Sequence, residues 1–246
     1  MFDQLDQEKA RLDAMRPLPP ALVRNLHDDL VVRWTYHSNA IEGNTLTLKE
    51  TRVILEGITV GGKLLREHFE TINHRDAIVY VESLVASSEP LSAWHLRNIH
   101  QLVLKNIDDE HAGHYRMINV LIAGAEHHHP DAIRVPAAMA DLLAWHQAAW
   151  DLHPVERATR LHADLVKIHP FVDGNGRTAR LLMNLELLRA GFPAVVLPVE
   201  QRLRYYEALD LAHTSGVYTL FLALIADSVA QSFRGYWRAL GVAPDA

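Results

Sequence analysis

The sequence predicts a mainly α-helical fold with one small β-hairpin flap. Apolar residues recur at helical spacing along most of the chain, whereas β-prone runs are short and confined to residues 113–136. The 246 residues are 49% hydrophobic and 22% charged, which is the composition of an ordinary globular protein. Because no repeat, low-complexity tract or flexible linker divides the chain, we expect a single domain over residues 1–246.

Proline and capping residues place the helices of the N-terminal half. A first helix stops before the prolines of segment 17–20, because proline cannot continue helical hydrogen bonding, and a second helix follows them. Segment 47–50, Thr-Leu-Lys-Glu, has the form of a capping box, and Ser92 can cap a later helix. The helices expected in this half cover about residues 4–14, 20–38, 47–57, 65–86 and 92–103.

The hairpin and the remaining helices follow from similar signals. The β-prone segments 119–122 and 133–135 flank Gly124 and Pro130, which suit a turn. Prolines open the next two helices, and a Gly-Phe-Pro stop at 191–193 ends a third. The helices expected in this half cover about residues 136–150, 154–168, 175–190, 200–213 and 217–240.

Charge and composition exclude several classes of protein. The formal charge of −6 gives no general attraction to nucleic acid or to anionic lipid. The absence of cysteine excludes disulfides and thiolate nucleophiles. The N-terminus is acidic where a signal peptide would be basic, and no stretch approaches membrane-spanning length. We therefore expect a cytoplasmic protein with no nucleic-acid partner and no membrane partner.

One loop between two predicted helices combines residues suited to phosphate chemistry. It reads His169-Pro170-Phe171-Val172-Asp173-Gly174-Asn175-Gly176-Arg177-Thr178-Ala179-Arg180. The two glycines let backbone N–H groups face an anion. The N-terminus of the following helix adds unpaired donors and the positive end of its dipole. A polyphosphate would be held there.

The side chains of this loop suit the same chemistry. Arg177 and Arg180 lie three residues apart in the first turn of the helix, and their guanidinium groups suit bidentate contacts with phosphate. Asp173 is a hard oxygen ligand beside the phosphates, as Mg²⁺ prefers. His169 supplies a base whose ordinary pKa is near neutrality.

Structural alternatives exist for each of these features taken singly. Asp-Gly-Asn-Gly is also a good turn, and a histidine at a helix end is often only a cap. An EF-hand counted from Asp173 fails, because Arg177, Thr178 and Asn184 stand where a ligand, a glycine and a glutamate are required. The P-loop lysine pattern and the dinucleotide-binding glycine pattern are absent as well.

The segment from His169 to Arg180 resembles the signature of the Fic (filamentation induced by cAMP) family, His-x-Phe-x-Asp-Gly-Asn-Gly-Arg-x-x-Arg, at every defining position. The resemblance implies a Fic-type helical bundle that moves AMP from ATP onto a Ser, Thr or Tyr hydroxyl of a target protein. Its catalytic core would cover about residues 60–235.

The resemblance also implies a role for each residue of the signature. His169 would deprotonate the target hydroxyl, and Asp173 would bind Mg²⁺. The remaining residues would bind the phosphates of ATP, through backbone amides or guanidinium groups. They are Gly174, Asn175, Gly176, Arg177 and Arg180.

An upstream segment, about residues 20–44, resembles the inhibitory helix of Fic proteins in which that helix precedes the core. It carries Ser38 and Glu42 in a Ser-x-x-x-Glu-Gly pattern. The resemblance implies that Glu42 pairs with Arg180 in the space that the γ-phosphate needs, while Ser38 helps to hold the helix. The alternative is a solvated Glu42 before a glycine helix stop.

Two further regions resemble parts of a Fic nucleotide site. Ile122, Ala123 and Gly124 belong to the expected flap, which aligns a target segment over the nucleotide by strand addition. Tyr205 and Tyr206 resemble the region beside the adenine pocket, with an aromatic core as the alternative.

The leading hypothesis is therefore an ATP-dependent adenylyltransferase (AMPylator) that Glu42 inhibits. A deAMPylase, another Fic-type phosphoryl or nucleotidyl transferase, and a non-catalytic nucleotide-sensing regulator are the alternatives. Self-modification and a homodimer also remain open.

Overall fold

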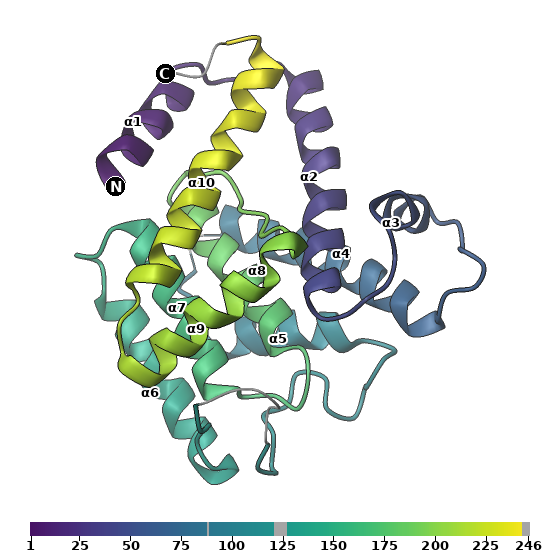
Figure 1. Cartoon of the computed structure of the whole chain (residues 1–246), viewed down its shortest axis with the longest axis vertical. Helices are drawn as coiled ribbons and strands as arrows, with labels where there is room; N and C mark the ends of the chain where they lie inside the picture. Colours follow the sequence, from purple (N-terminus) through teal and green to yellow (C-terminus); the bar gives the residue numbers. More distant parts are fainter. Residues whose placement is uncertain (88, 121–126, 243–246) are drawn as a thin grey trace.

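The computed structural model describes residues 1–87, 89–120 and 127–242. Within these ranges the regular structure is helical (Figure 1). The α-helices are α1 Phe2–Asp13, α2 Pro20–Ile41, α3 Leu48–Leu55, α4 Leu65–Ala86, α5 Ala93–Leu104, α6 Val135–Ala148, α7 Pro154–Ile168, α8 Asn175–Arg189, α9 Arg202–Ser215 and α10 Thr219–Leu240, and the 3₁₀ helices are η1 Ala132–Arg134 and η2 Val199–Gln201. Every helix expected from the sequence is confirmed.

The predicted capping box begins α3 as expected. The Glu50 backbone N–H donates to the Thr47 hydroxyl at 3.2 Å, and the Thr47 N–H donates to the Glu50 carboxylate at 2.7 Å. Glu67, in the first turn of α4, accepts from the backbone N–H and the hydroxyl of Thr45, both at 2.7 Å. The segment that follows α2 is therefore fastened at two points.

The predicted β-hairpin is not found, because no strand is present among the residues that the structure describes. The segment expected as its second strand, 133–135, lies instead in η1 and at the start of α6. Asn119 explains part of this difference, since its side chain accepts from the Ala132 N–H at 2.7 Å and fixes a helical turn there. Ile122, Ala123 and Gly124 lie outside the described residues.

α8 is the central element of the molecule, with buried side chains on all of its faces. On one side Leu181, Leu182 and Leu185 join a core built with residues of α4, α5, α6 and α7. On the other side Met183 and Leu187 join a second core with residues of α1, α7, α9 and α10. A helix enclosed in this way has its N-terminus held in a fixed position. No helix in the described ranges is long and apolar enough to cross a membrane.

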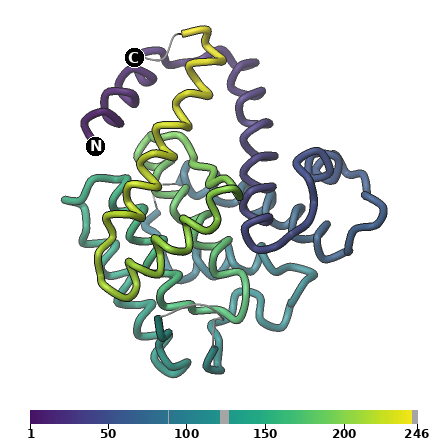
Figure 2. Tube along the Cα trace, viewed as in Figure 1, coloured from purple at the N-terminus to yellow at the C-terminus, as the bar shows by residue number. Residues whose placement is uncertain are grey.

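α2 lies beside elements that are distant in the sequence. Figure 2 shows its trace close to that of α10 near the top of the view, and it contacts both α10 and α4. Its C-terminal half is buried at Trp34, Thr35, Ser38, Asn39 and Ile41, whereas most of its N-terminal half is exposed. The end of α2 is thus packed into the molecule, while its beginning faces solvent.

We expect the replacement Asn184→Leu to destabilise the fold. The Asn184 amide donates to the Val195 carbonyl at 2.9 Å, and its oxygen accepts from the Val195 N–H at 2.7 Å, in a fully buried site. Leucine leaves both backbone groups without partners, which costs about 2–4 kcal/mol of unfolding free energy. Urea denaturation measures this loss. The exposed Asn25→Leu variant serves as the control, and equal stability of the two variants would contradict the assignment.

Candidate active site

The loop between α7 and α8 is closed by its own residues. His169, at the end of α7, has a left-handed backbone with φ of 51°, and Gly174, before α8, has φ of 75°. The buried Asn175 side chain then bridges the loop, donating to the Phe171 carbonyl and accepting from the Phe171 N–H, each at 2.9 Å. The sequence predicted a backbone role for Asn175 and missed this role of its side chain.

A histidine from α5 supports the underside of the loop. The ring of His100 stacks on that of Phe171, with centroids 3.5 Å apart and planes inclined by 4°. Its Nε2 donates to the Asp173 carbonyl at 2.9 Å, and its Nδ1 accepts from the Gly113 N–H at 2.9 Å. Burial lowers the pKa of His100 to about 4, so the neutral ring keeps both hydrogen bonds. The amphipathic pattern of α5 gave no signal for this role.

Arg116 joins the loop to the segment before the undescribed residues. Its side chain is buried, and its Nε donates to the His169 carbonyl at 2.8 Å. Its backbone N–H donates to the Pro170 carbonyl at 2.9 Å, and its other guanidinium nitrogens donate to the carbonyls of Ile118 and Pro130. The backbone on both sides of the undescribed segment is therefore held beside His169.

His169 lies half-buried against another imidazole. The ring centroids of His169 and His129 are 4.8 Å apart. The Nδ1–H of His129 donates to the Lys167 carbonyl at 2.9 Å. Burial, with smaller contributions from the neighbouring His129 and Arg116, lowers the pKa of His169 to about 3. The imidazole is therefore neutral at physiological pH and able to accept a proton.

Asp173 lies between two guanidinium groups. Its Oδ2 is 2.7 Å from Arg66 Nη2, and its Oδ1 is 3.5 Å from Arg177 Nη2. Burial is the largest influence and raises the pKa of Asp173, but Arg177, the Gly174 N–H and Arg66 together lower it below the ordinary value. The carboxylate is ionised, and its side chain is 47% exposed, so an entering cation can reach it.

Arg177 presents an unused donor to the site. Its side chain is only 3% exposed, and its Nε has no hydrogen-bond partner among the described residues. Its Nη1 is 3.6 Å from a Glu70 carboxylate oxygen, beyond hydrogen-bond distance. A buried arginine with an unsatisfied nitrogen beside a helix N-terminus fits a phosphate group, which offers several acceptor oxygens.

Arg180 connects the start of α8 to the end of α2. Its Nε donates to the Ser38 hydroxyl at 3.0 Å, and its Nη2 donates to the Ser38 carbonyl at 2.8 Å. The same Nη2 donates to Glu42 Oε1 at 2.8 Å. The pair of Glu42 and Arg180 expected from the sequence is thus formed in the structure, with Ser38 as a second acceptor.

The Glu42 carboxylate lies directly against the glycine that opens α8. A Cβ atom placed on Gly176 would lie 2.3 Å from Glu42 Oε1 and 3.1 Å from Arg180 Nη1. The carboxylate therefore lies in contact distance of the first turn of α8, beside the Gly176 backbone. It leaves no room for a side chain at residue 176.

The two tyrosines differ in their surroundings. Tyr205 is buried, and its hydroxyl accepts from Arg180 Nη1 at 3.3 Å and contacts His162 Nε2 at 3.1 Å. Burial raises the pKa of Tyr205. Tyr206 is 39% exposed, and its hydroxyl donates to the Ile41 carbonyl at 3.4 Å. Tyr205 thus supports Arg180 from the core, while Tyr206 lies at the surface beside the end of α2.

The arrangement brings a neutral base, an ionised carboxylate and two buried guanidinium groups to one helix N-terminus. No cluster of three or more His, Asp or Glu side chains that could hold a metal occurs in the described parts of the chain. One carboxylate together with phosphate oxygens and water suits Mg²⁺, which rarely uses an all-protein cage. Sequence reasoning missed Arg66, which pairs with Asp173, and His100, which supports the loop, and it placed Arg116 only in the expected flap.

Comparison with known proteins places the chain in a family. The Fic/DOC family model matches residues 90–187, which include the whole loop. A curated relative from Nematostella vectensis, named protein adenylyltransferase Fic, is 36% identical over 99% of this chain and 57% of its own length. The chain spans about half the length of the curated relatives that it matches.

Solved structures give the same relationship over nearly the full chain. A Fic domain containing signaling protein from Bacteroides thetaiotaomicron has a TM-score of 0.88, with 28% identity over 98% of both chains. Fic-1 from Caenorhabditis elegans also has a TM-score of 0.88, and its 34% identity covers 97% of this chain and 71% of that chain. At this identity and coverage, together with the match across the loop, the chain belongs to the Fic/DOC family.

Proposed function

We propose that this chain is a protein adenylyltransferase that transfers AMP from ATP to a Ser, Thr or Tyr hydroxyl of a target protein, and that Glu42 inhibits it. The catalytic core would cover about residues 60–235, and the inhibitory segment about residues 20–44. The observation that carries the proposal is the position of Glu42 Oε1, 2.8 Å from Arg180 Nη2 and against the backbone of Gly176. A carboxylate there mimics a bound phosphate, and the curated relatives are named as adenylyltransferases.

The phosphates of ATP would take the place of the Glu42 carboxylate. The backbone N–H groups at the start of α8 and the guanidinium of Arg177 would hold their oxygens, because Arg177 lies in the first turn of α8 and its Nε has no partner among the described residues. Arg180 would exchange Glu42 for a phosphate oxygen while keeping its bonds to Ser38. Mg²⁺ held by Asp173 and the phosphates would neutralise charge that develops on the leaving group.

His169 would begin the transfer as a general base. Its neutral imidazole accepts the proton as the O–H bond of the target hydroxyl breaks, and the oxygen attacks the α-phosphorus. The bond between that phosphorus and the bridging oxygen of the β-phosphate breaks, and pyrophosphate leaves. The anchored backbone of His169 keeps the imidazole in place, since Arg116 holds its carbonyl at 2.8 Å.

Segment 113–136 would position the target. Arg116 and His129 hold the two sides of this segment against the loop, so a target chain that docks there would bring its hydroxyl near His169. This proposal keeps the docking role of the predicted flap, including Ile122, Ala123 and Gly124, which lie outside the described residues.

We expect Glu42→Gly to raise AMP transfer roughly tenfold or more, which corresponds to removing about 1.4 kcal/mol of competition for Arg180. The measurement is incorporation of α-labelled ATP into the chain itself and into proteins of a cell lysate. Glu42→Gln, which keeps the size of the side chain but removes its charge, should give an intermediate rise.

The same experiment includes two controls on the type of reaction. His169→Ala in the Glu42→Gly background should abolish the label, because the general base is lost. γ-Labelled ATP should give none, because pyrophosphate leaves. Label from the γ-phosphate would instead identify a kinase, and binding without any label would identify a nucleotide-sensing regulator.

The pH dependence follows from the environment of His169. Its pKa is lowered to about 3, so the imidazole stays neutral as pH falls from 8 to 5. Protonation of the ring, which would remove the general base, is expected only as the pH approaches that pKa. A plot of the rate of AMP transfer by Glu42→Gly against pH should therefore show no decrease that is described by a pKa between 6 and 7. A tenfold fall for each pH unit below 6.5, traced to His169 by NMR titration of its ring, would contradict this.

Replacement of the proposed metal ligand should weaken catalysis. We expect Asp173→Asn in the Glu42→Gly background to lower AMP transfer roughly a hundredfold at fixed Mg²⁺, because metal stabilisation of phosphate charge contributes several kcal/mol. Excess Mg²⁺ should restore part of the rate. Asp108→Asn, another half-exposed loop carboxylate, is the matched control and should leave the rate unchanged.

A further inference from the structure

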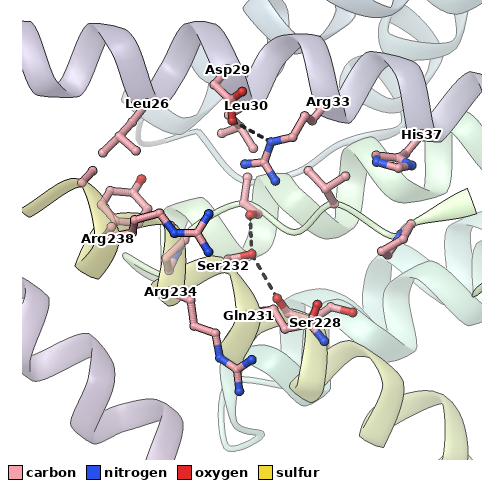
Figure 3. A pocket seen from close by; sticks show the side chains of 17 residues that line it. Leu26, Asp29, Leu30, Arg33, His37, Ser228, Gln231, Ser232, Arg234 and Arg238 are labelled. Atoms are coloured by element: carbon pink, nitrogen blue, oxygen red, sulfur yellow. Dashed lines mark hydrogen bonds and ion pairs between the residues drawn. The ribbon is translucent and has the colours of Figure 1, made fainter. Parts of the chain in front are cut away.

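A cavity of about 650 Å³ lies apart from the site described above, between α2, α10 and the segment 193–198. Figure 3 shows it from close by, with side chains from both helices around it. Its volume is in the range of small-molecule sites, about 300–1,000 Å³. None of the catalytic or phosphate-binding residues proposed above lines it.

Positive charge gathers around this cavity. Arg33 from α2 and Arg234 and Arg238 from α10 line it, with Asp29 as the one carboxylate, so the lining carries three positive charges against one negative charge. The whole chain has a formal charge of −6, which makes this local excess distinctive. In Figure 3 the guanidinium groups of Arg33 and Arg238 extend into the space between the two helices.

These arginines are available to a ligand. Arg33 pairs with Asp29 at 2.7 Å, but both side chains are about half exposed, and such pairs contribute little to stability. Arg234 and Arg238 form no ion pair with any residue in the ranges 1–87, 89–120 and 127–242. An anion that binds here can therefore reach two guanidinium groups without breaking a buried interaction.

The rest of the lining combines apolar side chains with a few polar ones, among them Gln231, Ser232 and Tyr236. Leu26, Leu30, Pro193 and Val196 contribute apolar side chains. The Ser232 hydroxyl already donates to the backbone carbonyls of residues 194 and 228, at 2.9 and 3.0 Å. The cavity thus offers cations beside apolar side chains, which suits an anionic head attached to an apolar body.

The cavity is also connected to the inhibitory contact through α2. The helix that carries Arg33 continues to His37, whose Nδ1 accepts from the Val199 N–H at 3.1 Å, and then to Ser38 and Glu42. α2 forms one wall of the cavity, and core elements form the other. A ligand that contacts both walls binds best when α2 is docked, so its binding increases the population of the docked state.

We propose that this cavity binds a small phosphorylated organic anion, and that binding holds α2 in place and strengthens inhibition by Glu42. The phosphate contacts Arg33 and Arg238, and the apolar part of the ligand packs against the apolar side chains of the cavity. The binding site stands independently of the catalytic assignment, whereas its inhibitory effect rests on the function proposed above.

Binding is tested with phenyl phosphate, a probe that has both required parts. Added to the full chain and followed by NMR, it should give saturable shifts of the Arg33, His37 and Arg238 backbone amides. The exposed double variant Arg33→Ala/Arg238→Ala should weaken binding at least tenfold, and Arg24→Ala, a matched exposed arginine of α2, should not. Absence of saturation, equal binding by the double variant, or shifts centred on Gly174 to Arg177 would overturn the site.

The regulatory effect needs separate readouts. Hydrogen exchange of the α2 amides should slow severalfold when phenyl phosphate saturates the cavity, and AMP transfer by the native chain should fall over the same concentrations. Transfer by Glu42→Gly should not change. Saturable binding with neither effect would overturn the regulatory part alone, and no AMP transfer by Glu42→Gly would count against the proposed function, not against the site.

Discussion

The buried guanidinium of Arg180 is the interaction on which the rest of the site depends. A buried charge is costly unless its hydrogen bonds are filled, and Arg180 obtains its partners from two elements. Ser38 and Glu42 come from the end of α2, and Tyr205 comes from α9. In this structure the cation is satisfied, and in the proposed reaction a phosphate oxygen would replace the Glu42 oxygen at Arg180.

The loop in front of Arg180 is rigid for a second reason. Its backbone groups are held from outside by His100 and Arg116 and from inside by the Asn175 side chain. A loop fixed in this way keeps its N–H groups and imidazole oriented, which would avoid reorganisation during the proposed transfer. Burial also keeps His100 and His169 uncharged, so the positive charge of the site comes from the arginines and the helix N-terminus.

α2 joins two features of the molecule. Its C-terminal end is buried and places Glu42 against Gly176, while its middle part, from Leu26 to His37, borders the cavity. The contact between Glu42 and Arg180 is thus formed at the end of a helix that also lines the cavity. A contact made along α2 can therefore change how firmly Glu42 is held.

The sequence by itself determined the helices, because their caps, prolines and apolar spacing are local signals, and it determined the loop from His169 to Arg180, because that chemistry lies within one short segment. It also indicated that Glu42 opposes Arg180, through resemblance and not through spacing. Only the tertiary structure decided that His100 and Arg116 hold the loop and that Arg66 pairs with Asp173, since these contacts join residues far apart in the chain. It also replaced the expected strand at 133–135 with helix, because the Asn119 side chain, a non-local partner, satisfies that turn.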